Sequence, residues 1–260
     1  MAEASSGETK AEFEVMTHFD KDASGFNFER TASGYRLRNR LVRGLFFKKY
    51  RRGAIALDLG CGTGEYTLSL AQAGFDVVGG DLSKGMLTVA KSKVQEDKFA
   101  EKIQLIRLES TKLPFRNEAF DTITCIAVLD WVPDSHRLLV EAHRVLKHQA
   151  TFIACLDSLW SPSRIHTNVQ FAISRRRKKH ARISNCIELK RSLTACDFII
   201  EKFFGDVLLA QVMTRLLYEP KGKVSADKVL KATQPLDSHL THLPLFKSLS
   251  EHYIIDARKK

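Results

Sequence analysis

A short apolar run ends in a turn with glycines at alternating positions, Gly60, Gly62 and Gly64, and the acid Asp58 lies just before it. Glycine has no Cβ, so this turn can adopt positive φ angles and let a ligand lie against the backbone. The amphipathic segment 66–74 indicates a helix whose N-terminal N–H groups face the same ligand. A strand, a glycine turn and a helix thus come in the order that builds a ligand-binding loop.

The glycine spacing separates two classes of ligand. A dinucleotide turn needs G-x-G-x-x-G, whereas this chain has G-x-G-x-G with Glu65 next in the sequence, and no P-loop lysine follows. An acid before the turn suits a positively charged ligand better than a diphosphate. The next apolar strand, 75–80, ends at Asp81, where a carboxylate can accept hydrogen bonds from ribose hydroxyls. Together these features predict a nucleoside ligand.

With these motifs, the chain from about Ala54 to Phe204 resembles the class I S-adenosylmethionine-dependent methyltransferases, and among them the branch with quinone-biosynthesis and natural-product enzymes. The resemblance implies an α/β fold with a doubly wound, seven-stranded, mostly parallel sheet whose last strand is antiparallel. It also implies an N-terminal helical lid and helical insertions near the acceptor. The expected reaction is O- or C-methylation of a small organic acceptor, lipid-like or anionic acceptors included, with S-adenosylhomocysteine as the product.

The resemblance also assigns cofactor contacts residue by residue. It implies that the glycine turn holds the methionine part, that Asp81 binds the ribose, and that Glu109 and Ser110 lie at the adenine edge in the motif before Leu113-Pro114-Phe115. The full set of expected cofactor-binding residues is Asp58, Gly60, Cys61, Gly62, Gly64, Asp81, Leu82, Met86, Glu109, Ser110, Cys125 and Ile126.

On the acceptor side, Asp130 and Trp131 stand where relatives most often have a pair of histidines. The resemblance places Asp130 near the transferred methyl group, where a partly buried carboxylate could act as general base. Capping of a helix that begins near Pro133, or binding of the cofactor's amino group, are its alternative roles. Phe19 and Tyr35 are expected in the lid and Tyr218 in the acceptor wall, with core packing as the alternative for each.

The composition fits one enzyme domain, since 44% of the residues are hydrophobic and 27% are charged. We expect a disordered tail over 1–10, a helical lid over 11–53, and the methyltransferase domain over 54–260 with insertions at 157–186 and 205–250. No apolar stretch is long enough to cross a bilayer and the polar N-terminus does not resemble a signal peptide, so a cytoplasmic protein is expected. Five cysteines without zinc-ligand spacing predict reduced thiols and no metal.

The chain carries a net charge of +11, and most of the excess lies after residue 150. Six of the eight residues from Arg175 to Arg182 are Lys or Arg, and a second basic stretch, 36–52, is interleaved with leucines. Such runs bind phosphate, RNA or an anionic membrane surface, or are simply solvated. Two alternative functions therefore stay open: an RNA or tRNA methyltransferase that uses 175–182, and a non-catalytic nucleoside-binding interaction subunit.

Overall fold

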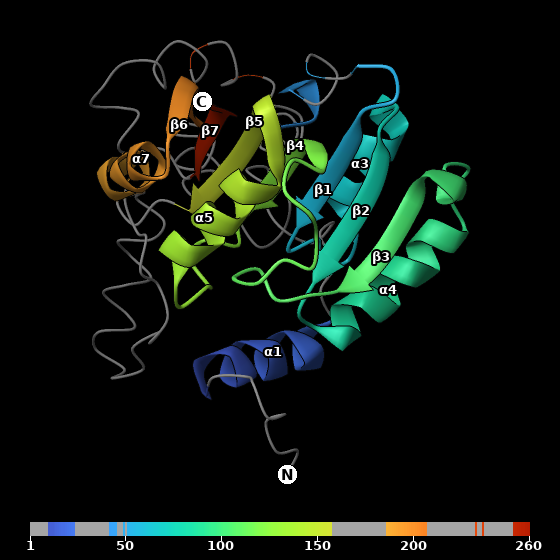
Figure 1. Ribbon diagram of the computed structural model, residues 1–260. Helices are drawn as coiled ribbons and strands as arrows, with labels where there is room; N and C mark the ends of the chain where they lie inside the picture. The colour runs from blue at the N-terminus through green and yellow to red at the C-terminus, as the bar shows by residue number, and fades with distance from the viewer. Residues whose placement is uncertain are drawn as a thin grey trace.

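The computed structural model describes residues 10–23, 42–45, 49, 51–157, 186–206, 232, 236 and 252–260. These residues form one seven-stranded sheet with helices on both faces (Figure 1). The strands are β1 (Ile55–Leu59), β2 (Asp76–Asp81), β3 (Ile103–Arg107), β4 (Phe120–Ile126), β5 (Leu146–Asp157), β6 (Phe198–Asp206) and β7 (His252–Lys259). The helices are α1 (Lys10–Asp22), α3 (Glu65–Ala73), α4 (Lys84–Gln95), α5 (Ser135–Val145) and α7 (Cys186–Ala195), with a 3-10 turn, η2, at Ala100–Lys102.

The strand order is β3-β2-β1-β4-β5-β7-β6. β1 pairs in parallel with both β2 and β4, while β7 runs antiparallel to its neighbours β5 and β6. The predicted sheet with an antiparallel last strand is therefore confirmed. The chain winds outward in opposite directions from β1 and β4, so the point between these two strands is the topological switch of the sheet, where α/β folds bind ligands.

Alternating residues of each strand enter two separate hydrophobic cores. Leu57 of β1 and Phe152 of β5 pack on one face with α5 and α7. Ala56 and Ile153, their sequence neighbours, pack on the other face with α3 and the segment 42–45. Both faces of the central strands are thus buried, as a parallel sheet with helices on each side requires.

Two local features differ from what the sequence pattern predicts, and a third agrees with it. The pattern of residues 12–18 predicts a first helix that ends at His18, with Phe19 and Asp20 in the following loop, but α1 continues to Asp22. The pattern of residues 151–156 predicts the fifth strand, but β5 begins earlier, at Leu146 directly after α5, and residues 147–150 form a bulge opposite β4. Along β7, the alternation of residues 253–257 predicts side chains on two faces, and Ile255 and Ala257 do enter one core while Ile254 enters the other. Both faces are covered, so the first six residues of β7 are all buried.

Several expectations lie outside the described residues. These are the tail up to residue 9, Tyr35, Tyr218, the basic run 175–182, and most of the insertions 157–186 and 205–250. Among the described residues, none of the helices has the length and apolar character that crossing a membrane requires.

Candidate functional site

The glycine turn between β1 and α3 adopts the predicted backbone. Gly60, Gly62 and Gly64 have φ angles of 74°, 53° and 83°. A Cβ on Gly60 would lie 2.3 Å from Val128 Cγ2, and one on Gly64 would lie 3.2 Å from Ala90 Cβ. A side chain at Gly62 would instead meet open space. The outer glycines therefore serve close packing, and Gly62 leaves the turn open to a ligand.

Asp81, at the end of β2, lies beside this turn. Its Oδ2 accepts a hydrogen bond from the Gly62 N–H (2.8 Å), and its Oδ1 accepts one from the Ser83 N–H (2.9 Å). The backbone N–H groups of Gly60 and Cys61 donate to the Gly80 carbonyl at 2.8 and 3.0 Å, so the turn is fixed to β2. Each carboxylate oxygen keeps a further lone pair, which a ribose diol can use.

Asp58 is buried beneath the turn rather than exposed to its opening. The hydroxyls of Thr67 and Thr124 donate to its two oxygens at 2.6 and 2.7 Å. Burial raises the pKa of Asp58 to about 6 against the lowering effect of these hydrogen bonds, and the charge of Asp81 raises it further. Burial also raises the pKa of Asp81. Because burial and mutual repulsion disfavour the ionised form of these two neighbouring carboxylates, a bound cation would stabilise their charged form.

The two cysteines among the expected contacts are not suited to nucleophilic chemistry. Cys61 and Cys125 are buried, and burial raises the pKa of both thiols well above their ordinary value. The Cys125 side chain lies in the core with α5, so only its backbone can reach a ligand. Leu82 directly follows β2 and Ile126 is the last residue of β4, so both lie at the edge of the sheet where the parallel strands end.

A tight turn at 109–112 follows β3 at the same edge of the sheet. The backbones of Glu109 and Lys112 form an isolated antiparallel β-bridge, and the Lys112 N–H donates to the Glu109 carbonyl at 3.2 Å. The Thr111 hydroxyl donates to the Glu109 carboxylate and orients it. Just before the turn, the Leu108 N–H donates to the Asp81 carbonyl at 3.0 Å. The structure thus brings Glu109 and Ser110 next to the strand end that carries Asp81.

The segment after β4 carries Asp130 and Trp131. Ala127 adopts a positive φ of 57°, a strained value for a residue with a Cβ. The Asp130 Oδ1 is shielded from solvent. The N-cap of helix α5 is Asp134, whose Oδ1 accepts a hydrogen bond from the Arg137 N–H at 3.0 Å. The alternative in which Asp130 caps this helix is therefore wrong.

Helix α1 lies at the edge of the sheet where β2 and β3 end (Figure 1). At one place, Asp20 Oδ1 accepts from the Ser83 hydroxyl (2.5 Å) and the Gly85 N–H (2.8 Å) at the start of α4. At another, Phe19 packs edge-on against Trp131 with the ring centroids 5.0 Å apart, and His18 stacks on Trp131 at 5.5 Å. α1 therefore bridges the segments on both sides of the glycine turn.

Sequence reasoning missed Asp20, which joins α1 to α4, and Arg144, which binds the segment after the 109–112 turn. Neither residue lies in a motif, and the partners of Asp20 lie 63 and 65 residues away. Met86, an expected contact, is buried and its N–H donates to the Ser83 hydroxyl at 3.0 Å. No cluster of metal-binding side chains occurs in the parts of the chain that the structure describes.

Comparisons with known proteins agree with this geometry. Residues 57–154 match a family model described as a methyltransferase domain. The chain is similar to a demethylmenaquinone methyltransferase of Lactiplantibacillus plantarum, with 40% identity over 108 residues that cover 40% of this chain and 45% of that protein. The chain thus spans about half the length of the curated relatives it matches.

Two solved structures share the fold over nearly the whole chain. Geranyl diphosphate C-methyltransferase from Streptomyces coelicolor has a TM-score of 0.64 and 14% identity, and the match covers 97% of this chain and 99% of that one. The [4+2]-cyclase SpnF has a TM-score of 0.61 and 19% identity, and the match covers 96% and 97%. Because one structure is a methyltransferase and the other a cyclase, the fold alone does not define the reaction.

Proposed function

We propose that this chain, in which residues 57–154 are a class I methyltransferase domain, transfers a methyl group from S-adenosylmethionine to a small organic acceptor. The predicted family is confirmed by the match to the domain model and by the relatives of the quinone branch. The observation that carries the proposal is the pairing of Asp81 with the open turn at Gly62. A carboxylate that can accept hydrogen bonds from a ribose diol thus lies beside an uncovered stretch of backbone, at the switch point of the sheet.

The residues of the site fit this cofactor. We assign the ribose hydroxyls to Asp81, the adenine edge to Glu109 and Ser110, and the methionine part to the turn from Gly60 to Gly64. The carboxylates of Asp58 and Asp81 favour a ligand with positive charge, because a cation relieves their mutual repulsion. When bound, S-adenosylmethionine supplies an electrophilic methyl group on a cationic sulfur.

The acceptor would lie between the end of β4 and α1. There, Trp131, Phe19 and His18 present aromatic rings that can stack on a flat acceptor. Demethylmenaquinone methyltransferase, the name of the relatives, supports a quinol-like ring as the first acceptor to try. We assign the removal of the acceptor's proton to Asp130, which precedes Trp131 and has its Oδ1 shielded from water.

The basic stretches contribute less to the proposal. Within 36–52, Arg43 donates to Ser69 Oγ at 2.6 Å, and Lys49 pairs with Glu201 at 2.9 Å. Val42 and Leu45 are buried in the core, so the described part of this stretch packs on the domain instead of facing a membrane. An anionic or membrane partner at 175–182 is an inference from sequence alone. A cytoplasmic setting is inferred from the five free cysteines.

The test measures cofactor binding and methyl transfer in parallel. Calorimetry with S-adenosylmethionine and S-adenosylhomocysteine gives the Kd, and labelled-methyl transfer to a panel of naphthoquinols and other hydroxylated rings gives turnover. Asp81→Asn should weaken binding about tenfold or more, since it removes a charged hydrogen-bond acceptor worth roughly 1.5–3 kcal/mol. Asp130→Asn should lower turnover at least about a hundredfold with Kd nearly unchanged, as loss of a general base does.

Asp76→Asn is the matched control, because Asp76 lies at the other end of β2 with an exposed side chain and should change neither quantity. Binding without transfer to any acceptor would support the interaction-subunit alternative. Binding of NAD in place of S-adenosylmethionine would refute the assignment of the glycine turn. Equal loss of binding and turnover in Asp130→Asn would move Asp130 to the cofactor site.

A further inference from the structure

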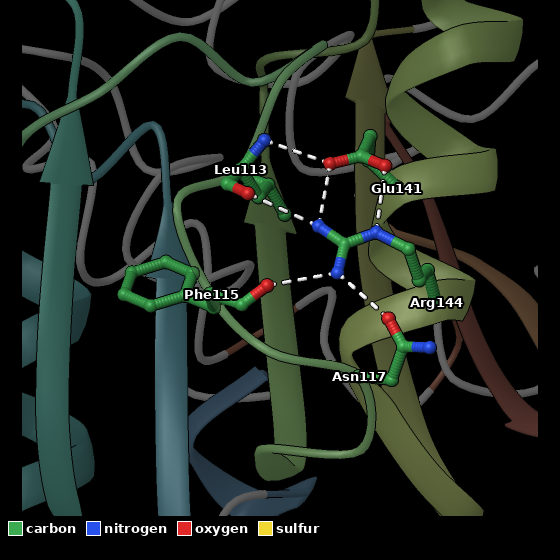
Figure 2. A network of polar contacts seen from close by, with 5 residues as sticks. All are labelled: Leu113, Phe115, Asn117, Glu141 and Arg144. Atoms are coloured by element: carbon green, nitrogen blue, oxygen red, sulfur yellow. Dashed lines mark hydrogen bonds and ion pairs between the residues drawn. The ribbon is translucent and has the colours of Figure 1, made fainter.

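Arg144, near the end of α5, uses every donor that its guanidinium has. Its Nε donates to Glu141 Oε1 at 2.8 Å, and its Nη2 donates to Glu141 Oε2 (2.8 Å) and the Leu113 carbonyl (3.0 Å). Its Nη1 donates to the Phe115 carbonyl at 2.8 Å and to Asn117 Oδ1 at 2.9 Å. Figure 2 shows the guanidinium in the middle of this network. A guanidinium has five N–H donors, so the group is saturated.

The partners of the Arg144 guanidinium all belong to one segment, 113–117, apart from Glu141 on its own helix. Glu141 reinforces the contact, because its Oε2 also accepts from the Leu113 N–H at 2.8 Å. Both backbone polar groups of Leu113 are therefore held by the Arg144–Glu141 pair. The Leu113 side chain is buried in the core with α5. This pair fixes the place where the chain leaves the 109–112 turn.

The entrance to the same turn is fixed at a different place. The Leu108 N–H donates to the Asp81 carbonyl, and a Cβ on Gly80 would lie 2.4 Å from Leu108 Cδ2. The turn that carries Glu109 and Ser110 is thus held between β2 on one side and α5 on the other. No α-helix lies between β3 and β4 to support it. Its position depends on these two anchors.

We propose that Arg144 is a positioning residue for adenine recognition, which it serves by anchoring the outgoing end of the 109–112 turn from a distance. The inference rests on the proposed function, because it assigns the adenine edge to Glu109 and Ser110. With the anchor in place, the Glu109 carboxylate, oriented by Thr111, is held where it can accept from an amino group of the base. Without it, the outgoing end keeps the buried Leu113 side chain and the bond from the Leu113 N–H to Glu141, but the carbonyls of Leu113 and Phe115 lose their donor.

The chemistry of the anchor requires arginine. Lysine has three donors around a single nitrogen, which cannot reach two carbonyls, an amide oxygen and both oxygens of a carboxylate at once. The bidentate geometry with Glu141 holds the guanidinium plane in a fixed direction. Arg144→Lys keeps the charge and the stem of the side chain but loses this reach, so it isolates the positioning role.

The experiment compares the Kd of S-adenosylhomocysteine with that of its hypoxanthine analogue, in which a carbonyl replaces the adenine amino group. The wild-type chain should prefer the adenine form about tenfold or more, as one charged hydrogen bond allows. Arg144→Lys should bring this ratio close to one, mainly by weakening the adenine form. Glu141→Gln, which keeps the side-chain volume, should lower the ratio in the same direction. Amide hydrogen exchange at 109–113 should speed up in both variants, while exchange at 57–60 stays unchanged.

Lys147→Met is the matched control. Lys147 lies three residues further along the chain, and its ammonium group donates to Asp121 of β4, at 2.8 Å in the shorter contact. Its loss should leave the ratio at the wild-type value. An unchanged ratio in both Arg144→Lys and Glu141→Gln, or an equal loss of both ligands, would overturn the inference and leave the proposed function intact. If the wild-type chain binds neither ligand, the proposed function itself fails.

Discussion

At the residue scale, Asp58 is a carboxylate whose charge depends on the pH and on the ligand. It lies beneath the glycine turn, and its two oxygens accept from the hydroxyls of Thr67 and Thr124. Burial raises its pKa to about 6, so near neutral pH it is ionised at a cost to folding. We interpret Asp58 as a buried source of negative potential for a cationic ligand, with Asp81 as the acid that makes direct contact.

The first prediction concerns the effect of pH on this residue. The folded-state pKa lies above the unfolded value near 3.8, so the stabilisation from protonated Asp58 is complete below about pH 4 and is lost as the pH rises through about 6. Cation binding favours the ionised form. The Kd for S-adenosylmethionine should therefore rise as the pH falls from 7 to 5, by up to about tenfold below pH 6.

Calorimetry between pH 5 and 7 measures this dependence. Asp58→Asn removes the titrating group while retaining one oxygen as an acceptor for the threonine hydroxyls, so its Kd should vary less with pH. Asp81 faces the same turn and also has a raised pKa, so Asp81→Asn should weaken binding while a pH dependence persists. An unaltered pH dependence in Asp58→Asn would assign the titration to Asp81.

At the element scale, the sequence predicted those elements whose ends carry local signals. α3 begins at a glycine with positive φ and ends at Gly74, which also has positive φ, and both were read correctly from the glycines. α4 follows an N-cap serine, Ser83, whose hydroxyl accepts from the Met86 N–H. The end of α1 was placed too early, because Asp20 continues the helix with partners on α4 that no nearby residue announces.

The joint between α5 and β5 contains no glycine, since the chain reads Lys147-His148-Gln149-Ala150 there. Gln149 occupies this bulge with a φ of 61°, a left-handed conformation that costs a residue with a Cβ about 1–2 kcal/mol. Gln149→Gly removes this strain, but glycine loses more backbone entropy on folding, so the net gain in the free energy of unfolding should be about 0.5–1 kcal/mol. Gln149→Ala, which keeps the Cβ, should stay near the wild-type value. Urea unfolding measures both, and a glycine variant less stable than the alanine variant would contradict the strain argument.

At the scale of the whole molecule, the resemblance carried by the glycine turn and the acids at the strand ends implied a doubly wound sheet, and the observed strand order confirms it. The cofactor edge was also predictable, because glycines and acids at strand ends fall together once the strands are parallel. The ties between distant parts of the chain were not predictable. The Arg144 side chain binds residues that lie 27 to 31 positions earlier in the chain, and Lys49 binds Glu201, 152 positions later. No sequence motif relates the members of either pair.

The ion pair between Lys49 and Asp256 joins the region before β1 to the last strand. Their atoms lie 3.2 Å apart, and the Asp256 side chain is completely buried. Burial raises the pKa of Asp256 although Lys49 opposes this, so the carboxylate relies on its partner to stay charged. Lys49→Met should lower the free energy of unfolding by about 3–5 kcal/mol, because it leaves a buried charge without compensation.

Urea unfolding of matched variants tests this final prediction. Lys102→Met removes an ion pair of similar chemistry with Asp76, but Lys102 is partly exposed and Asp76 is exposed, so it should cost less than about 1 kcal/mol. Asp256→Asn in the Lys49→Met background should recover part of the loss, since it removes the isolated charge. Because Asp256 can take up a proton, the loss in Lys49→Met should also shrink as the pH falls. Equal, small effects of Lys49→Met and Lys102→Met would mean that the segment around Lys49 unfolds separately from β7.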